Sequence, residues 1–162
     1  MANRLFSSRA FSSTFRLLTY SKVHSRNYAS EMSFTFASPA EVFYNKESVK
    51  QVDVPSYSGS FGILPNHVPT LAVLKPGVVT VFENDGAAKK FFVSSGSVTI
   101  NDDSSVQVLA QEAVPLDRID TQACREGLTK AQQALSSAST EESKAEAQIG
   151  IEVHEELIKA TS

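Results

Sequence analysis

The stretch VVTVFENDGAAKKFFVSS, residues 78–95, decides the fold more directly than any other part of the sequence. Apolar and polar residues alternate on both sides of Asn84-Asp85-Gly86, a pattern typical of half-buried strands. Asp-Gly tolerates the positive φ that a primed turn requires. The stretch therefore predicts an antiparallel β-hairpin in the middle of a sheet.

Short alternating runs of the same kind fill the chain from Met32 to Glu112, separated by turn-forming residues such as Pro76-Gly77. Together with the hairpin they amount to about nine short strands, which predicts a β-sandwich or a β-barrel. Besides the hairpin, the runs are residues 32–38, 41–45, 48–54, 60–64, 70–75, 97–101 and 105–112.

The apolar period changes after Pro115 and becomes helical. A first amphipathic helix of about 18–20 residues is expected there, with Asp117 as its N-cap. Its apolar positions are Leu116, Ile119, Ala123, Leu128, Ala131 and Leu135.

Residues 136–140 interrupt the first helix and predict a turn. Ser139 and Glu142 then form a capping-box pattern, which predicts a second helix that ends near Ala160. Because the link is short, the two helices are expected to form an antiparallel hairpin. The predicted apolar stripe of the second helix includes Ala145, Ile149, Val153 and Leu157.

The first 29 residues have the composition of a mitochondrial transit peptide. Residues 1–30 contain five Lys or Arg residues and no Asp or Glu, with many Ser and Thr between them. The alternative is a basic tail that stays attached. The sequence thus divides into a transit peptide (1–29), a β-sandwich domain (30–115) and a helical hairpin domain (116–162), which together make an α+β protein in two parts.

The charge distribution argues against nucleic acid as a partner. The net charge is −3, and because the first 30 residues carry +5, the remainder carries −8. Such an acidic body is poorly suited to phosphate backbones, which are bound mostly through Lys and Arg. No run approaches the roughly 20 apolar residues of a membrane-spanning helix, so membrane contact is expected only through partners.

Residues for catalysis are also lacking in the sequence. Cys124 is the only cysteine, which leaves no pair for a disulfide and no Cys-based metal site. The glycines match neither a phosphate-binding loop nor a dinucleotide-binding motif, and the serines match no nucleophile elbow. We therefore expect a non-catalytic protein without a cofactor or metal.

The segment GSFGILPNHVPTL, residues 59–71, is the strongest candidate for function. Pro65 and Pro69 restrict the backbone of a loop between two strands, and Gly62 permits another group to approach closely. Phe61, Ile63 and Leu64 supply apolar side chains beside the loop. Such a segment presents a fixed shape to a partner.

These residues closely resemble the delta/epsilon family of F-type ATP synthase subunits in its mitochondrial form. The resemblance covers the MSFTFASP opening, the GxxGILPNHVPTLxxLxPGxV motif, the FFVSSGSVxI strand pair and the acidic helical hairpin at the C-terminus. It implies a flattened sandwich of about ten strands followed by two helices.

The same resemblance implies a non-catalytic rotor subunit in the central stalk, which couples ring rotation to ATP synthesis. Its implied partners are the proteolipid c-ring, the gamma subunit and the small mitochondrial epsilon subunit. Its implied location is peripheral, on the matrix side of the mitochondrial inner membrane. The residues carried over as the ring-contact segment are Ser60, Phe61, Gly62, Ile63, Leu64, Pro65, Asn66 and His67.

Two positions depart from the family pattern. Ser60 stands where bacterial members often have an acid, so docking by shape and apolar burial is expected in place of an ion pair. Arg125 lies two places late relative to the nucleotide-binding pattern that begins at Ile119-Asp120, so nucleotide sensing is not expected. His67 remains open between a ring contact and a histidine that bonds backbone carbonyls.

Two other functions remain as alternatives. The hairpin of a regulatory inhibitor would leave the sandwich and insert into the catalytic head, which a thin, alanine-rich seam would permit. An unrelated hydrolase or binding module on a sandwich scaffold is the third possibility.

Overall fold

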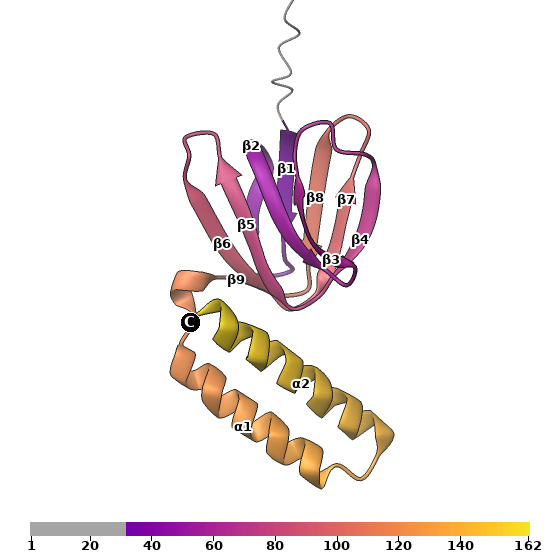
Figure 1. Cartoon of the computed structure of the whole chain (residues 1–162), viewed down its shortest axis with the longest axis vertical. Helices are drawn as coiled ribbons and strands as arrows, with labels where there is room; N and C mark the ends of the chain where they lie inside the picture. Colours follow the sequence, from indigo (N-terminus) through magenta and orange to yellow (C-terminus); the bar gives the residue numbers. More distant parts are fainter. Residues whose placement is uncertain (1–31) are drawn as a thin grey trace, which may run out of the picture.

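The computed structural model describes residues 32–162; the transit peptide predicted for residues 1–29 lies outside them. Nine strands form a flattened two-layer sandwich, and two helices form a hairpin at one end of it (Figure 1). The predicted sandwich-plus-hairpin fold is thereby confirmed. The strands are β1 Met32–Ala37, β2 Val42–Ser56, β3 Gly59–Ile63, β4 Thr70–Leu74, β5 Gly77–Glu83, β6 Ala88–Val93, β7 Gly96–Ile100, β8 Ser105–Ala110 and β9 Ala113–Pro115.

Strand β2 belongs to both layers. Its first half pairs with β1, and its second half pairs with β3 and β5. The register shifts near Val49 and Gln51, and Lys46 has a φ of 55°, as expected where bulges bend a strand. The two separate strands expected at 41–45 and 48–54 are therefore one strand, because its irregular residues redirect the chain without ending its pairing.

The remaining strands follow the order β1-β8-β7-β4 in one layer and β3-β2-β5-β6-β9 in the other. Strand β1 pairs with β8 in parallel, while the other pairings are antiparallel. Alternate side chains of each strand enter the space between the layers, so the core is a sheet-on-sheet interface. The largest fully buried side chains are Phe34, Phe36, Met32, Ile63, Leu74, Val52, Val54, Val79, Val81, Val93, Val98 and Val106.

The predicted β5–β6 hairpin is present, with Val79 opposite Phe91 and Phe82 opposite Ala88. Its turn differs from the expected primed turn. Only Gly86 has a positive φ, 93°, and its N–H donates to the carbonyl of Glu83 at 3.1 Å. The loop is therefore a three-residue turn, residues 84–86, that ends in a left-handed glycine. The side chain of Asp85 stabilises it by accepting a hydrogen bond from Ala87 N–H at 2.8 Å.

The helical hairpin consists of α1 Thr121–Ser137 and α2 Glu141–Ala160, preceded by a short 3-10 turn at Leu116–Arg118. The predicted N-caps were wrong in both helices. Asp120, not Asp117, caps α1 by accepting hydrogen bonds from the N–H groups of Gln122 and Ala123. Asp117 instead lies within the 3-10 turn, which delays the start of the α-helix.

The capping box of α2 lies one residue later than expected. Thr140 and Ser143 exchange the two capping hydrogen bonds, whereas Ser139 and Glu142 had been predicted to do so. A serine can replace the expected Glu because its hydroxyl reaches the N-cap N–H at 3.2 Å.

The seam between the helices is built from small residues. Cys124 and Ala147 are buried there, Gly150 faces Ala131, and the imidazole of His154 lies directly against Gly127. The predicted stripe was wrong at three of its positions, because Ala123, Ala145 and Ile149 are exposed. Glycine and alanine allow the helices to approach closely, so small residues define the contact in place of the larger apolar ones.

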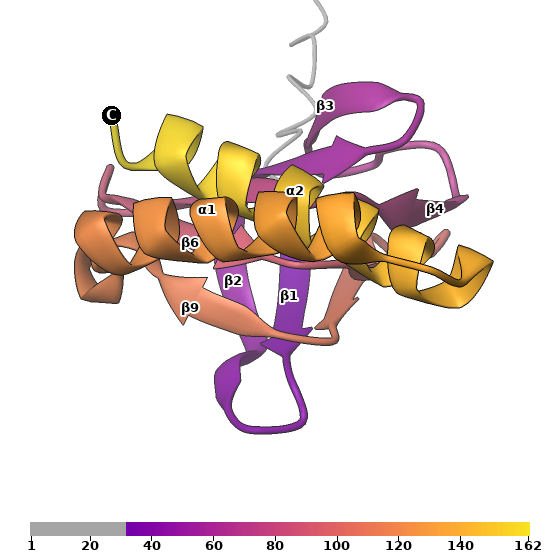
Figure 2. The same ribbon diagram turned by 90° about the horizontal axis from the view of Figure 1, so that it is seen from below.

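The hairpin meets the sandwich mainly through the C-terminal half of α2, which lies beneath the strand ends in Figure 1 and crosses in front of them in the view from below (Figure 2). Val153 and Leu157 face Phe92 and Val114 across a small cavity of about 130 Å³. This limited contact places the hairpin beside the sandwich and leaves the other ends of its sheets uncovered.

Gly127 and Gly150 form a matched pair for testing the seam. A Cβ at Gly127 would lie 2.6 Å from His154 Nε2, whereas a Cβ at Gly150 would lie at an ordinary 3.4 Å from Ala131. We expect Gly150→Ala to stabilise the protein by up to about 1 kcal/mol through helix propensity. Gly127→Ala should instead destabilise it by about 1 kcal/mol, because the clash exceeds that gain.

Urea unfolding followed by the helical circular dichroism signal measures both changes. Gly127→Ala combined with His154→Ala should recover the stabilisation, because the smaller side chain removes the clash. Equal stabilisation by the two single substitutions would show that His154 does not restrict the seam.

Candidate functional site

The segment predicted to contact a partner is divided between a strand and a loop. Its first part forms β3, and its second part forms the loop that leads to β4. The side chains differ in exposure: Ser60, Gly62, Leu64 and Asn66 are exposed, Phe61, Pro65 and His67 are half-buried, and Ile63 is fully buried. Ile63 therefore belongs to the core, while the contact role of the other residues stays a prediction.

The loop is held by a partner that the sequence did not indicate. Asn66 N–H donates to Ser104 Oγ at 3.1 Å, and Ser104 Oγ donates to Asn66 Oδ1 at 3.2 Å. Both residues have positive φ, 63° and 64°, and Ser104 is buried. The β3–β4 loop is thus fixed to the β7–β8 turn as well as by its prolines.

His67 contributes to the same rigidity. Its Nδ1 lies 2.9 Å from the carbonyl oxygen of Val68, and its ring centroid lies 6.0 Å from that of Phe61. The backbone N–H of His67 donates to the carbonyl oxygen of Leu64 at 3.1 Å. The interpretation of His67 as a histidine that bonds the backbone therefore agrees with its geometry.

An exposed apolar surface continues from this loop onto the sheet. Leu71 on β4 is 75% exposed and Val68 in the loop is 73% exposed. The register aligns Val73 with Ser97 and then with Leu109, so these side chains share the outer face of β4, β7 and β8. We call this surface the apolar face and define it as Leu64, Val68, Leu71, Val73 and Leu109.

Four of these residues, Val68, Leu71, Val73 and Leu109, were missed as site residues. The signal for Leu71 and Val73 was present, because residues 71–74 are consecutively apolar, whereas a strand with one solvated face should alternate. An apolar run of this kind indicates that both faces of the strand are meant to be covered.

The outer face of the β1-β8-β7-β4 layer carries no charged side chain on the strands themselves. Lys46 on β2 and Asp103 in the β7–β8 turn line a hollow together with Ser33, Thr35 and Gln107, so the charged side chains lie at the border of these four strands. Depletion of charge beside exposed apolar groups is typical of the centre of a protein–protein interface. The outward residues of these strands are Ser33, Thr35, Ala37, Leu71, Val73, Ser97, Thr99, Ser105, Gln107 and Leu109.

The outer face of the other layer is polar at β3. The register places Gly62, Asp53, Thr80 and Lys90 in one row across β3, β2, β5 and β6. Gln51 Nε2 donates to Asp53 Oδ1 at 2.6 Å beside Gly62. The two parts of the predicted segment therefore adjoin surfaces of different chemistry.

A hydrogen-bonded charge network ties the β5–β6 hairpin to the core. Tyr44 donates to Glu83 Oε1 at 2.9 Å, and Lys89 forms an ion pair with the same oxygen at 2.8 Å. The hydrogen bond from Lys89, followed by that from Tyr44, lowers the pKa of Glu83 below its usual value of 4.5. Burial, followed by the bond to Glu83, raises the pKa of Tyr44. This network stabilises the fold.

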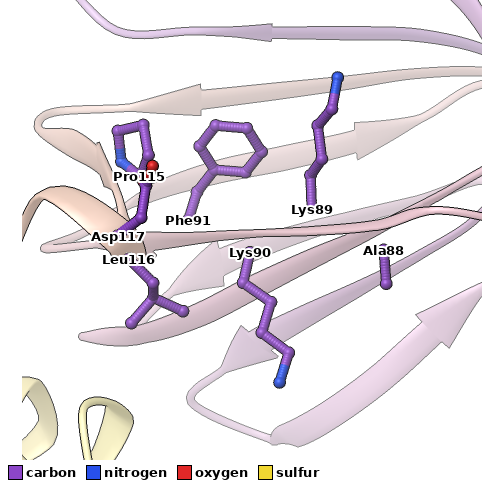
Figure 3. A pocket seen from close by; sticks show the side chains of 7 residues that line it. All are labelled: Ala88, Lys89, Lys90, Phe91, Pro115, Leu116 and Asp117. Atoms are coloured by element: carbon purple, nitrogen blue, oxygen red, sulfur yellow. The ribbon is translucent and has the colours of Figure 1, made fainter.

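A hollow of about 490 Å³ beside this network lies between β6 and the start of the 3-10 turn (Figure 3). Lys89 and Lys90 extend to opposite sides of β6, and the nearby Asp117 is the only carboxylate in its lining. The hollow therefore brings together no nucleophile with a base and no pair of carboxylates.

Residues 32–162 contain no group of three or more His, Cys, Asp or Glu side chains placed to hold a metal ion. Cys124 is buried, and that burial, with the nearby charge of Asp120, raises the pKa of its thiol. Within the same residues, neither helix is long and apolar enough to cross a bilayer.

The lowered pKa of Glu83 predicts a pH dependence. A carboxyl whose pKa is depressed by folding adds stability above its unfolded value, near 4.5, and loses it as the pH falls through the folded value. We expect Glu83→Gln to reduce stability at pH 7 and to flatten the loss of stability below pH ~4.5.

Thermal unfolding of the two proteins between neutral and acidic pH measures this difference. Glu41→Gln is the control. It removes the same charge as Glu83→Gln, but Glu41 forms no ion pair within residues 32–162. Parallel curves for the wild-type protein and Glu83→Gln would contradict the assignment.

Comparison with known proteins gives matches along both parts of the chain. Residues 31–116 match a family model described as the β-sandwich domain of the ATP synthase delta/epsilon chain. Residues 119–160 match a model of the C-terminal domain of the metazoan delta subunit of F1F0-ATP synthase. The two matches cover nearly all of the described residues.

A relative from Caenorhabditis elegans, named mitochondrial ATP synthase subunit delta, is 50% identical over 132 residues, which cover 82% of this chain and 80% of the worm protein. A chain in the mitochondrial ATP synthase of Euglena gracilis superposes with a TM-score of 0.76 at 23% identity over all of both chains. A chain from the central stalk and c-ring of the Tetrahymena thermophila enzyme gives 0.60 at 18% identity, over 82% of this chain and 97% of that one. At these identities the two structures agree with this chain in fold.

Proposed function

The chain belongs to the delta/epsilon family of ATP synthase subunits, and on this premise we propose that it is a central-stalk subunit of the mitochondrial enzyme. In this role it links the proteolipid ring to the gamma subunit and so couples proton-driven rotation to ATP synthesis. The observation that carries the proposal is an exposed apolar face on a rigid sandwich that lacks a catalytic constellation among its described residues. The subunit then works by binding and stiffness.

The apolar face is the proposed contact for gamma. Burial of its exposed side chains against a partner would remove apolar surface from water, which favours binding. The loop that carries Leu64 and His67 is fixed to Ser104, so it adds to this contact without a large cost of ordering. A rotating stalk requires such a stiff joint.

The ring is the proposed partner of the β3 end, at Ser60 and Gly62. This surface is polar, with Gln51 and Asp53 beside it, and suits the polar loops that the family places on the ring. The proposal narrows the predicted ring-contact segment to its strand part and assigns its loop part to gamma. Contact with the membrane then runs only through the ring, on the matrix side of the inner membrane.

The helical hairpin is the proposed site for the small mitochondrial epsilon subunit. Ile149 is 61% exposed on α2, and a separate hollow along the seam contains small side chains of both helices that another helix could approach. The competing function, inhibition by a hairpin that leaves the sandwich, draws support from the limited contact of Val153 and Leu157 with the strands.

Cysteine crosslinking in the assembled complex tests the two contacts. A cysteine at Ser60 should crosslink to the proteolipid ring, and one at Leu71 should crosslink to gamma. A cysteine at Asn84, in the exposed β5–β6 turn, is the control. If position 60 crosslinks to gamma and not to the ring, the assignment of the β3 end to the ring is wrong.

A charge on the apolar face should weaken binding of gamma. We expect Leu71→Asp to reduce retention of gamma in the purified complex by at least about tenfold, since a carboxylate would lose its water without gaining a partner. Val42→Asp is the matched control, because Val42 is 60% exposed at the opposite edge of the layer. Equal loss of gamma in both variants would contradict the proposed contact.

Deletion of residues 117–162 separates the two functions proposed for the hairpin. A structural hairpin predicts loss of assembly or coupling, without faster ATP hydrolysis by the catalytic head. Faster hydrolysis in the truncated complex would instead support the inhibitor.

A further inference from the structure

We propose that Asp53, seated over Gly62, presents a fixed carboxylate through which the β3 end binds a basic side chain of the proteolipid ring. This inference rests on the ring contact proposed above and names its chemistry. It also changes an expectation from the sequence, since the uncharged Ser60 had suggested docking without an ion pair.

The strand pattern directs Asp53 outward. Val52 and Val54 are fully buried between the layers, so Gln51 and Asp53 lie on the outer face of β2. Gln51 Nε2 donates to Asp53 Oδ1 at 2.6 Å, which fixes the carboxylate through a neighbour on its own strand. One oxygen is thereby held, and no hydrogen bond or ion pair within residues 32–162 engages the other.

Gly62 provides the space in which this carboxylate lies. It is paired with Asp53 across β2 and β3, and a Cβ at Gly62 would lie 2.8 Å from Asp53 Oδ1 and 3.1 Å from Gln51 Nε2. The φ of Gly62 is outside the positive range, unlike those of Gly59 and Gly86. The glycine is therefore required here for the room it leaves, because its backbone conformation is open to other residues.

The charge of Asp53 is not neutralised within residues 32–162. The ion pairs there involve Lys89, Lys144 and Lys159, and none includes Asp53. Lys90 occupies the same row of the sheet, but Thr80 on β5 lies between them. An oriented carboxylate without a cation fits an ammonium or guanidinium group from outside the chain.

Pre-organisation makes this contact useful for a rotor. A surface ion pair usually loses much of its energy to the ordering of two mobile side chains. Here the bond from Gln51 and the position over Gly62 have already ordered the carboxylate, so the partner alone is immobilised. The contact would also fix where the ring docks along β3.

The test measures retention of the ring by the complete, purified ATP synthase during a titration with sodium chloride. We expect Asp53→Asn to weaken retention about threefold to fivefold at low salt and to reduce the salt dependence, because charge pairing is screened by ions. Asp102→Asn, which removes an exposed carboxylate from the β7–β8 turn, should behave like the wild-type protein.

A second variant tests the seat itself. Gly62→Ala displaces only the end of a side chain, so the fold should be kept while the carboxylate leaves its position. It should weaken ring retention by a similar factor, and the double variant with Asp53→Asn should be no weaker than either single one. Additive losses would overturn the role of Gly62 as the seat.

The outcomes distinguish this inference from the function on which it rests. Suppose that a cysteine at Ser60 crosslinks to the ring, but the Asp53→Asn enzyme retains the ring like the wild-type enzyme at every salt concentration. The ion pair is then wrong, and the ring contact stands. If position 60 does not reach the ring, both are wrong.

Discussion

The passage of β2 from one layer to the other is the constraint on which the rest of the structure depends. A strand of 15 residues would extend well beyond a sandwich of short strands if it stayed straight, so its bulges must bend it. The bend places Tyr44 and Val54 in one continuous core although they pair in different layers. It also determines where β3 lies, and hence the direction of Gly62 and of the loop that follows.

Most of the fold could be predicted from the sequence because it depends on local alternation and period. The features that were missed depend on choices between close neighbours or on contacts between distant residues. Asp117 and Asp120 can both cap a helix, and only the 3-10 turn excludes the first. The seam at Gly127 and His154 and the tie between Asn66 and Ser104 join residues far apart in sequence, which no periodicity describes.

The candidate site shows the same division between what is local and what is not. The motif around Ser60 to His67 was visible as a segment, but the structure separates it into a polar strand and an apolar loop. Leu71 and Val73 could have been found from their unbroken apolar run, whereas Asp53 could not, since only the register of β2 and β3 brings it to Gly62. Two surfaces of unlike chemistry on one rigid body allow two partners to be held at a fixed angle.

The parallel pairing of β1 with β8 has a consequence for the order in which the sandwich can form. Met32–Ala37 is the first described strand in the chain, and one of its two neighbours is Ser105–Ala110. A polypeptide that enters a compartment with its N-terminus first would hold β1 half-paired until some seventy further residues had followed. During that interval Phe34 and Phe36 would lack much of their cover, so transport of the chain and completion of its core are coupled in time.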